Sequence, residues 1–180
     1  YPQSMRNHLN INVKFREKFR PFAPSVLEED LYNYFEINQK SEHMLIACQV
    51  KKKMKKKISA TVHIDNTCRV QSVSKKTNLS FWKLLNEFKK KTGVPVLLNT
   101  SFNIKGMPIV NDAVDAIECF MKYNIDYLVL DTFLINKNKK LNKKNMNNKF
   151  PGKDISDEDL KTKFPLASKK NDSHRSKFKI

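Results

Sequence analysis

The chain has 180 residues, which is room for one domain of ordinary size, and its formal net charge is +17 at pH 7. Residues 1–136 hold 21 Lys and Arg against 13 Asp and Glu, a net +8, and residues 137–180 hold 14 against 5, a net +9. A positive field of this size attracts phosphates, nucleic acid or anionic lipid without choosing among them. The sequence shows no signal peptide and no apolar run of roughly 18 residues, so we expect no membrane anchor.

The cysteines show which kinds of disulfide or metal site the chain could form. Cys48, Cys68 and Cys119 lie far apart and form no Cys-x-x-Cys pair, so neither a disulfide framework nor a zinc site is indicated, and we expect no metal site. A reducing, cytoplasmic setting follows as an expectation. The chain begins with Tyr1 rather than Met, which favours a piece of something longer.

The first expected element is a strand over residues 14–27. Lys14, Arg16, Lys18 and Arg20 recur at period two beside an apolar face that includes Phe15 and Phe19, which predicts a strand whose even-numbered face is cationic. A solvated lysine-rich edge strand is the alternative. We favour an anion site, because Lys14, Arg16 and Arg20 lie on one face near three aromatic rings.

Three further elements follow. Residues 28–35 show the spacing of a short amphipathic helix, and residues 44–50 are typical of a buried strand. Lys51 to Lys57 carries six lysines around Met54, which indicates a solvated loop or a frayed helix. Nonspecific nucleic-acid contact through this segment and the basic tail is the alternative.

A hairpin is predicted from residues 60–65 and 68–73, with the turn at residues 66–67. Its non-core face would carry His63, Asp65, Arg69 and Gln71. A His and an Asp two residues apart could bind metal or move protons, but exposed polar strand positions are the favoured interpretation.

The second half predicts a helix over residues 81–91, capped by Asn78 or Ser80 and ended by Gly93, and then a strand over residues 94–98. A further helix over residues 113–122 follows a cap at Asn111 or Asp112, and residues 127–130 form another strand. Strand, loop, helix and strand in this order form a βαβ-type unit, so the fold class is α/β or α+β with a mixed sheet.

Small polar side chains follow the strand at residues 94–98: Asn99, Thr100, Ser101 and Asn103, and then Lys105 and Gly106. In α/β folds ligands collect at the carboxyl ends of strands, so this loop is a candidate anion or nucleotide site. The alternative is ordinary turn formation by the same residue types.

From residue 137 onward the chain is mostly Lys, Asn, Asp and Ser. Such a composition cannot bury enough apolar surface to offset the entropy of ordering. We therefore predict a folded domain over residues 1–136 and a disordered basic tail over residues 137–180.

Three long motifs resemble one known family. They are Lys-Phe-Arg-Glu-x-Phe-Arg-Pro-Phe-Ala-Pro-Ser-Val-Leu, His-x-Asp-x-Thr-x-Arg-Val-Gln-x-Val and Leu-Asn-Thr-Ser-Phe-Asn-x-x-Gly-x-Pro-Ile-Val. In this order they are similar to the C-terminal domain of the nodulation-type and antibiotic-biosynthetic O-carbamoyltransferases, over about residues 1–135. The resemblance implies a YrdC-like fold, a twisted mixed β-sheet flanked by helices, with an N-terminal truncation.

The resemblance also implies an activity. In that family this domain activates carbamoyl phosphate with ATP, expected with Mg, to carbamoyl adenylate, and a separate N-terminal ASKHA-type domain passes the carbamoyl group to a hydroxyl of the acceptor. This chain would then be a fragment or one subunit of a split enzyme. A threonylcarbamoyl-adenylate synthase relative in tRNA modification and a basic nucleic-acid-binding module are the alternatives.

The resemblance assigns roles residue by residue. Lys-x-Arg and Ser-x-Asn signatures of YrdC-like proteins match Lys14-Phe15-Arg16 and Ser101-Phe102-Asn103. Catalytic roles fall to Lys14, Arg16 and Arg69, and binding roles to Arg20, His63, Asp65, Asn99, Ser101, Asn103 and Lys105. Position 105 is often Arg in the family and is Lys here, which keeps the charge and loses the bidentate fork.

Overall fold

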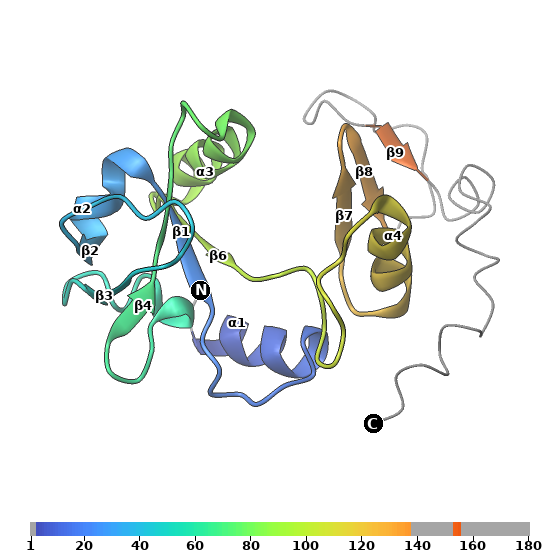
Figure 1. Cartoon of the computed structure of the whole chain (residues 1–180), viewed down its shortest axis with the longest axis horizontal. Coiled ribbons are helices and arrows are strands. Elements are labelled where there is room, and N and C mark those ends of the chain that lie inside the picture. Colours follow the sequence, from blue (N-terminus) through green and yellow to red (C-terminus); the bar gives the residue numbers. More distant parts are fainter. Residues whose placement is uncertain (1–2, 138–152, 156–180) are drawn as a thin grey trace. The chain divides into compact units, whose positions relative to one another are not determined.

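The structure, a computed structural model, describes residues 3–137 and 153–155 (Figure 1). Nearly all of the predicted disordered tail lies outside the described residues, so the boundary at residue 137 stays a prediction. The chain divides into two compact units, Tyr1–Ser101 and Phe102–Ile180, and each is considered by itself.

The first unit begins with helix α1 (Gln3–His8) and a π-helical turn, η1 (Leu9–Val13). The strand predicted over residues 14–27 is wrong in its first half, because regular strand geometry begins only at Ala23. Asn10 supplies the physical reason: its buried side chain donates to Lys18 O at 3.2 Å and Arg20 O at 2.8 Å. These bonds hold the chain in a loop where the charge pattern alone predicted a strand.

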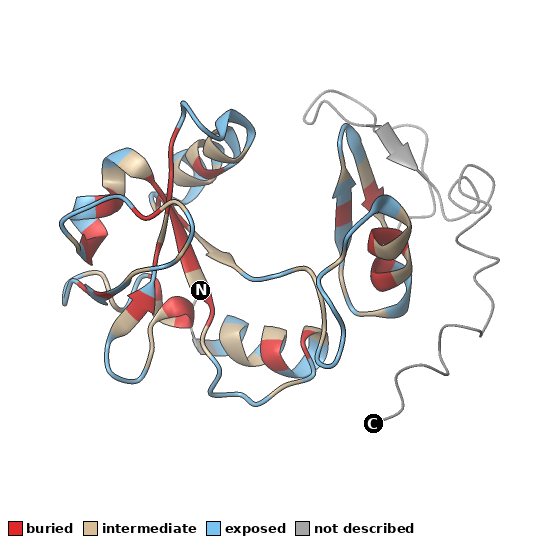
Figure 2. Ribbon diagram, in the orientation of Figure 1, coloured by how far each residue is buried: buried red, intermediate tan, exposed pale blue. Residues whose placement is uncertain are grey.

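A mixed three-stranded sheet lies at the centre of this unit. Strand β1 (Ala23–Leu27) pairs in parallel with β5 (Gln71–Val73) and antiparallel with β6 (Val96–Asn99). Figure 2 shows β1 as the most continuously buried strand, and Val26 and Leu27 are fully buried. The predicted α/β class with a mixed sheet is therefore confirmed.

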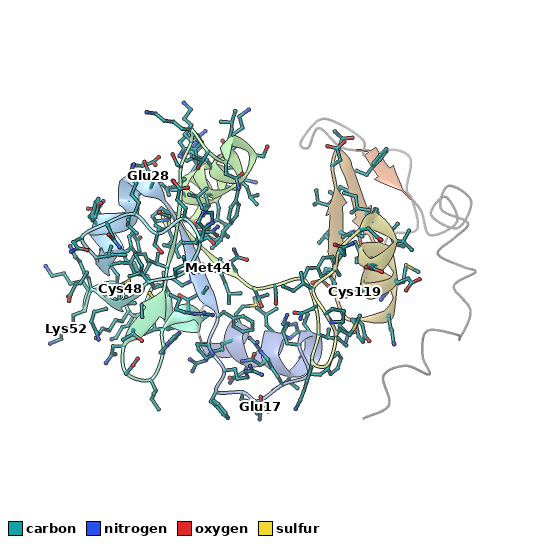
Figure 3. All side chains as sticks on the ribbon, viewed as in Figure 1. Glu17, Glu28, Met44, Cys48, Lys52 and Cys119 are labelled. Carbon is teal, nitrogen blue, oxygen red and sulfur yellow. The ribbon has the colours of Figure 1, made fainter. Side chains whose placement is uncertain are left out.

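A second sheet has the order β2 (Phe35–Glu36), β3 (Ala47–Val50) and β4 (Thr67–Arg69). The helix expected over residues 28–35 is divided into a 3-10 turn, η2 (Glu28–Asp30), and one turn of α-helix, α2 (Leu31–Tyr34). Leu31, Tyr34 and Phe35 are buried in one apolar cluster with residues of β3 and β4. Cys48 on β3, labelled in Figure 3, lies opposite Cys68 on β4, and both thiols are free.

The predicted hairpin over residues 60–73 is wrong. Residues 59–61 form a 3-10 turn, η3 (Ser59–Thr61), and β4 and β5 belong to different sheets. The chain turns at residues 63–67 instead, where His63 N donates to Thr67 O at 2.8 Å and Asn66 has a φ of 68°. Gln71 therefore does not share a strand face with His63 and Asp65.

Helix α3 (Leu79–Thr92) confirms the predicted helix and its two ends. Asn78 Oδ1 accepts from Phe81 N at 3.2 Å, and Gly93 ends the helix in the left-handed region, at a φ of 73°. Leu85 is fully buried against Leu27 and Val73.

Removing the N-terminal cap should lower stability measurably. Asn78→Ala leaves Phe81 N without its side-chain acceptor, so we expect the free energy of unfolding to fall by about 1 kcal/mol. Urea denaturation followed by circular dichroism measures this change. Ser80→Ala, two residues further along the helix, is the matched control, and an equal loss there would contradict the capping role.

The second unit contains helix α4 (Ala113–Lys122), whose predicted bounds are confirmed, with Asp112 as its cap. Strands β7 (Tyr127–Leu130) and β8 (Phe133–Asn136) are antiparallel, and β9 (Lys153–Ile155) pairs in parallel with β8. The predicted βαβ unit is wrong, because β6 and β7 belong to separate sheets. Among the described residues no helix is both long and apolar enough to cross a bilayer.

Candidate functional site

Two segments 87 residues apart meet at Lys14. Lys14 follows η1, where its backbone N donates to Leu9 O at 2.8 Å, and its side chain is only 4% exposed. The ammonium Nζ donates to the backbone oxygen of Ser101, two residues past the end of β6, at 2.8 Å. The structure therefore brings the Lys-Phe-Arg segment against the start of the Ser-Phe-Asn segment.

Arg16 is positioned by the residues around it. Its Nε donates to Asn10 Oδ1 at 2.7 Å, and its guanidinium lies 4.7 Å from the centre of the Phe22 ring. Burial, and then the charge of Arg20, lower the pKa of Arg16, while Glu17 acts in the opposite direction. The guanidinium is thus fixed in direction by a hydrogen bond and a ring contact, as binding of an anion requires.

Phe15, between these two cations, has a φ of 50°. A bulky residue rarely adopts this left-handed conformation, and it costs of order 1–3 kcal/mol. Backbone strain of this kind persists where the surrounding structure enforces it, often at ligand sites. The strained residue lies between Lys14 and Arg16 in the sequence, so the conformation of Phe15 determines how both cations leave the backbone.

A polar network crosses the central sheet at the end of β6. Asn99 Nδ2 donates to Ser25 Oγ and to Gln71 Oε1, both at 3.0 Å, and Ser25 Oγ donates to Gln71 Oε1 at 2.7 Å. Asn99 was a predicted site residue, but sequence reasoning missed Ser25 and Gln71 as its partners. The available signal was a serine within the apolar stretch of β1, since a fully buried hydroxyl needs a partner.

His63 and Asp65 are joined through Thr67. Asp65 Oδ1 accepts from both Thr67 N, at 2.9 Å, and Thr67 Oγ1, at 2.7 Å, and these bonds lower the pKa of Asp65. Because the hydroxyl proton of Thr67 goes to Asp65, its oxygen is free to accept from His63 Nδ1, 3.2 Å away. This arrangement places the proton of neutral His63 on Nδ1 and leaves Nε2 as the basic nitrogen.

The pKa of His63 lies below its ordinary value of 6.5, chiefly because of burial. Arg69 and Arg6 lower it further, and Asp65 raises it.

A lowered histidine pKa means that the unfolded state binds the proton more tightly, so stability falls as pH drops below about 6.5 and levels off below the folded-state pKa. His63→Gln should therefore flatten the pH dependence of the unfolding midpoint between pH values of about 7.5 and 5. Thermal unfolding of both proteins across this range tests it, and an unchanged slope would contradict the assignment.

The other predicted site residues make contacts of their own or lie at the surface. Arg20 and Arg69 are exposed, and Arg20 Nη1 lies 3.7 Å from Glu17 Oε2. Asn103 and Lys105 belong to the second unit, where Asn103 Nδ2 donates to Met107 O at 3.0 Å and Lys105 lies in an exposed turn. Within the described part of the chain, no group of three or more His, Cys, Asp or Glu side chains is arranged to hold a metal ion.

Comparison with known proteins finds relatives that match most of this chain. A nodulation protein NolNO of Sinorhizobium fredii is 42% identical over 139 residues, which are 76% of this chain and 20% of that protein. Nodulation protein NolO of Bradyrhizobium diazoefficiens is 42% identical over 139 residues, 76% of this chain and 25% of that protein. An uncharacterised protein of Synechocystis is 39% identical over 154 residues, 74% of this chain and 25% of that protein.

The chain thus spans a quarter or less of the length of these relatives. A family described as the carbamoyltransferase C-terminus matches residues 1–137, which include Lys14, Arg16, the polar network and every other predicted site residue. The chain belongs to the carbamoyltransferase C-terminus family.

Proposed function

We propose that this chain is the part of a carbamoyltransferase that activates carbamoyl phosphate with ATP. The observation that carries the proposal is the buried ammonium of Lys14 held against the backbone of Ser101, with Arg16 fixed beside the same strained residue. Two oriented cations and a hydroxyl-bearing loop are the groups that phosphoryl and nucleotidyl transfer need, because negative charge gathers on the reacting phosphates.

In the proposed reaction, carbamate forms first and is then adenylated. Carbamoyl phosphate and water give carbamate and inorganic phosphate; a carbamate oxygen then attacks the α-phosphorus of ATP, the bond to the β-phosphate oxygen breaks, and pyrophosphate leaves. The product is carbamoyl adenylate. We assign Lys14, Arg16, Arg20 and Arg69 to the phosphates.

Asn99, Ser101 and Asn103 are assigned to the nucleotide and the carbamoyl group, with His63 and Asp65 orienting them and Lys105 adding charge. The polar network supports the role of Asn99, because Ser25 and Gln71 fix its amide at the end of β6. A magnesium ion would arrive with the phosphates of ATP, as is usual for nucleotides.

Transfer of the carbamoyl group to an acceptor hydroxyl is proposed for the remaining length of such enzymes, in an ASKHA-type domain or subunit. The chain covers a quarter or less of its relatives, and we assign the choice of acceptor to the part of such enzymes that it does not cover.

The decisive measurement is exchange of labelled pyrophosphate into ATP, with the 180-residue chain alone and with the rest of such an enzyme supplied. Exchange that depends on carbamoyl phosphate supports the proposal. Exchange that depends instead on threonine and bicarbonate would favour a threonylcarbamoyl-adenylate synthase, and exchange with neither substrate set would overturn adenylate formation.

A further inference from the structure

A cavity of about 370 Å³ lies in the first unit, and its lining includes neither Lys14 nor Asn99. Its walls come from α1, the loop before β1, the lysine-rich turns and the segment from η3 to the turn at residues 63–67. The lining includes Arg6, Phe19, Lys55, Lys56, Ser59 and His63. The volume is of the size that binds small molecules.

The walls of this cavity are electropositive. Arg6, Lys55 and Lys56 carry positive charge, His63 can acquire it, and no Asp or Glu is among the lining residues. No carboxylate among the described residues forms an ion pair with either lysine. A concave surface lined by one sign of charge concentrates its field and draws in an anion.

Arg6 carries a donor that the protein does not use. Its Nη1 donates to Val62 O at 3.1 Å, which ties α1 to the wall of the cavity. Its Nε is buried and has no hydrogen-bond partner among the described residues. The guanidinium of Arg6 is thus only partly satisfied by protein groups, and as a lining residue it adds its positive charge to the attraction of an anion.

The lysine-rich turns are held in place rather than loosely solvated. Lys51 N donates to Tyr34 O at 2.9 Å, Met54 N donates to Lys51 O at 2.8 Å, and Lys57 N donates to Met54 O at 2.9 Å. The Met54 side chain packs against the apolar cluster of the second sheet. Lys55 and Lys56 therefore begin from a fixed backbone, which lowers the entropy lost when they bind a ligand.

We propose that this cavity binds the phosphoryl group of a small organic phosphate. Lys55, Lys56 and Arg6 would hold the phosphoryl oxygens, and the ring of Phe19, 77% exposed at the cavity, would pack against the organic part. Val62 and Ile64 extend this apolar side. Arg6, Phe19, Lys55 and Lys56 have no role in adenylate formation, so the site goes beyond that step, and His63 is the lining residue that belongs to both.

Protonation of His63 should make ligand binding in this cavity depend on pH. Its Nδ1 faces Thr67, so an anion in the cavity would favour a proton on Nε2. Asp65 also favours the charged ring, and Arg6 and Arg69 oppose it, as does burial. Binding should therefore take up a proton and strengthen as pH falls through the range in which His63 titrates.

Nuclear magnetic resonance of the His63 ring in the 180-residue chain reports on this cavity directly. The probes are inorganic phosphate and phenyl phosphate at fixed ionic strength; His63→Gln assigns the signal, and the exposed His43 is the internal reference. We expect a saturable shift of His63, a raised pKa and tighter binding of phenyl phosphate than of inorganic phosphate. Equal binding of these two probes, with no effect of Phe19→Ala, would overturn the organic-phosphate assignment.

A matched pair of double variants separates contact from net charge. Lys55→Gln with Lys56→Gln should weaken phenyl phosphate binding about tenfold or more, because two charged hydrogen bonds are lost. Lys52→Gln with Lys53→Gln changes the same charge outside the lining, and Lys52 lies at the outer edge of the unit in Figure 3; we expect less than about a twofold effect. Equal weakening by the two pairs, or no saturable binding, would overturn the site.

Two further outcomes separate this site from its alternatives. A short single-stranded oligonucleotide that displaced phenyl phosphate at physiological salt would assign the lysines to nucleic acid instead. Lys14→Met should lower pyrophosphate exchange strongly and leave phenyl phosphate binding unchanged. Failure of adenylate formation therefore leaves this proposal standing, and failure of this one leaves adenylate formation standing.

Discussion

Lys14→Met is expected to lower carbamoyl phosphate-dependent pyrophosphate exchange by about 100-fold to 1000-fold, the usual cost of removing one preorganised charge-stabilising group. The substitution keeps the length of the buried side chain and removes the ammonium that donates to Ser101 O. Charge on the reacting phosphates then loses its partner in the transition state, so kcat should fall more than the KM for ATP rises.

Lys18→Met is the matched control, because Lys18 lies in the same loop, is exposed and has no assigned role. Its exchange rate should stay within about twofold of the parent, as expected for loss of one screened surface charge. Urea denaturation of both variants shows whether the loss of rate follows the loss of folded protein. If Lys14→Met retained exchange while folded, or if Lys18→Met lost as much, Lys14 would not be a catalytic residue.

The elements that were predicted correctly from the sequence are those that depend on residues close to one another in the chain. Helix α4 was predicted with its observed bounds, and α3 to within two residues at each end, because caps at Asp112 and Asn78 and the stop at Gly93 act on neighbouring backbone groups. The apolar faces of both helices are also local patterns. Such elements need no knowledge of distant residues.

The errors arose where distant contacts override local pattern. Alternating charge in residues 14–20 predicted a strand, yet the buried side chain of Asn10 binds two backbone oxygens there and curves the chain. No period or motif marks Asn10 as special. The predicted hairpin failed for a similar reason, since β4 pairs with β3 and β5 pairs with β1, which are both far away in the sequence.

The candidate site likewise has some residues that could be found from the sequence and others that could not. The Lys-Phe-Arg and Ser-Phe-Asn motifs identified Lys14 and Ser101, and the structure joins them by a hydrogen bond. Of the residues that hold the site, Asn10 lies outside the three motifs, whereas Ser25 and Gln71 lie within two of them and only the structure shows that they bond to Asn99. The hydrogen-bond partners that position a motif residue therefore have to come from the structure.

Asn10→Ala is expected to lower the free energy of unfolding by about 2–4 kcal/mol, because three hydrogen bonds of a fully buried side chain are lost together. Lys18 O and Arg20 O lose their donor, and Arg16 Nε loses its acceptor. The loop should then sample other conformations, so Arg16 is no longer fixed. We expect exchange to fall by about 10-fold to 100-fold through misplacement of Arg16, measured well below the unfolding midpoint of the variant.

Asn12→Ala is the control for this position, because Asn12 is exposed and its amide contacts only the His8 ring, at 3.0 Å. Its effect on stability should stay within about 0.5 kcal/mol. Asn10→Asp separates the two roles of the side chain: the carboxylate still accepts from Arg16 Nε but cannot donate to Lys18 O and Arg20 O. If Asn10→Asp restored both stability and exchange, the donor bonds would be unimportant and the loop would be held by Arg16 alone. We expect instead that Asn10→Asp remains destabilised, because a carboxylate beside two carbonyl oxygens is repelled by both.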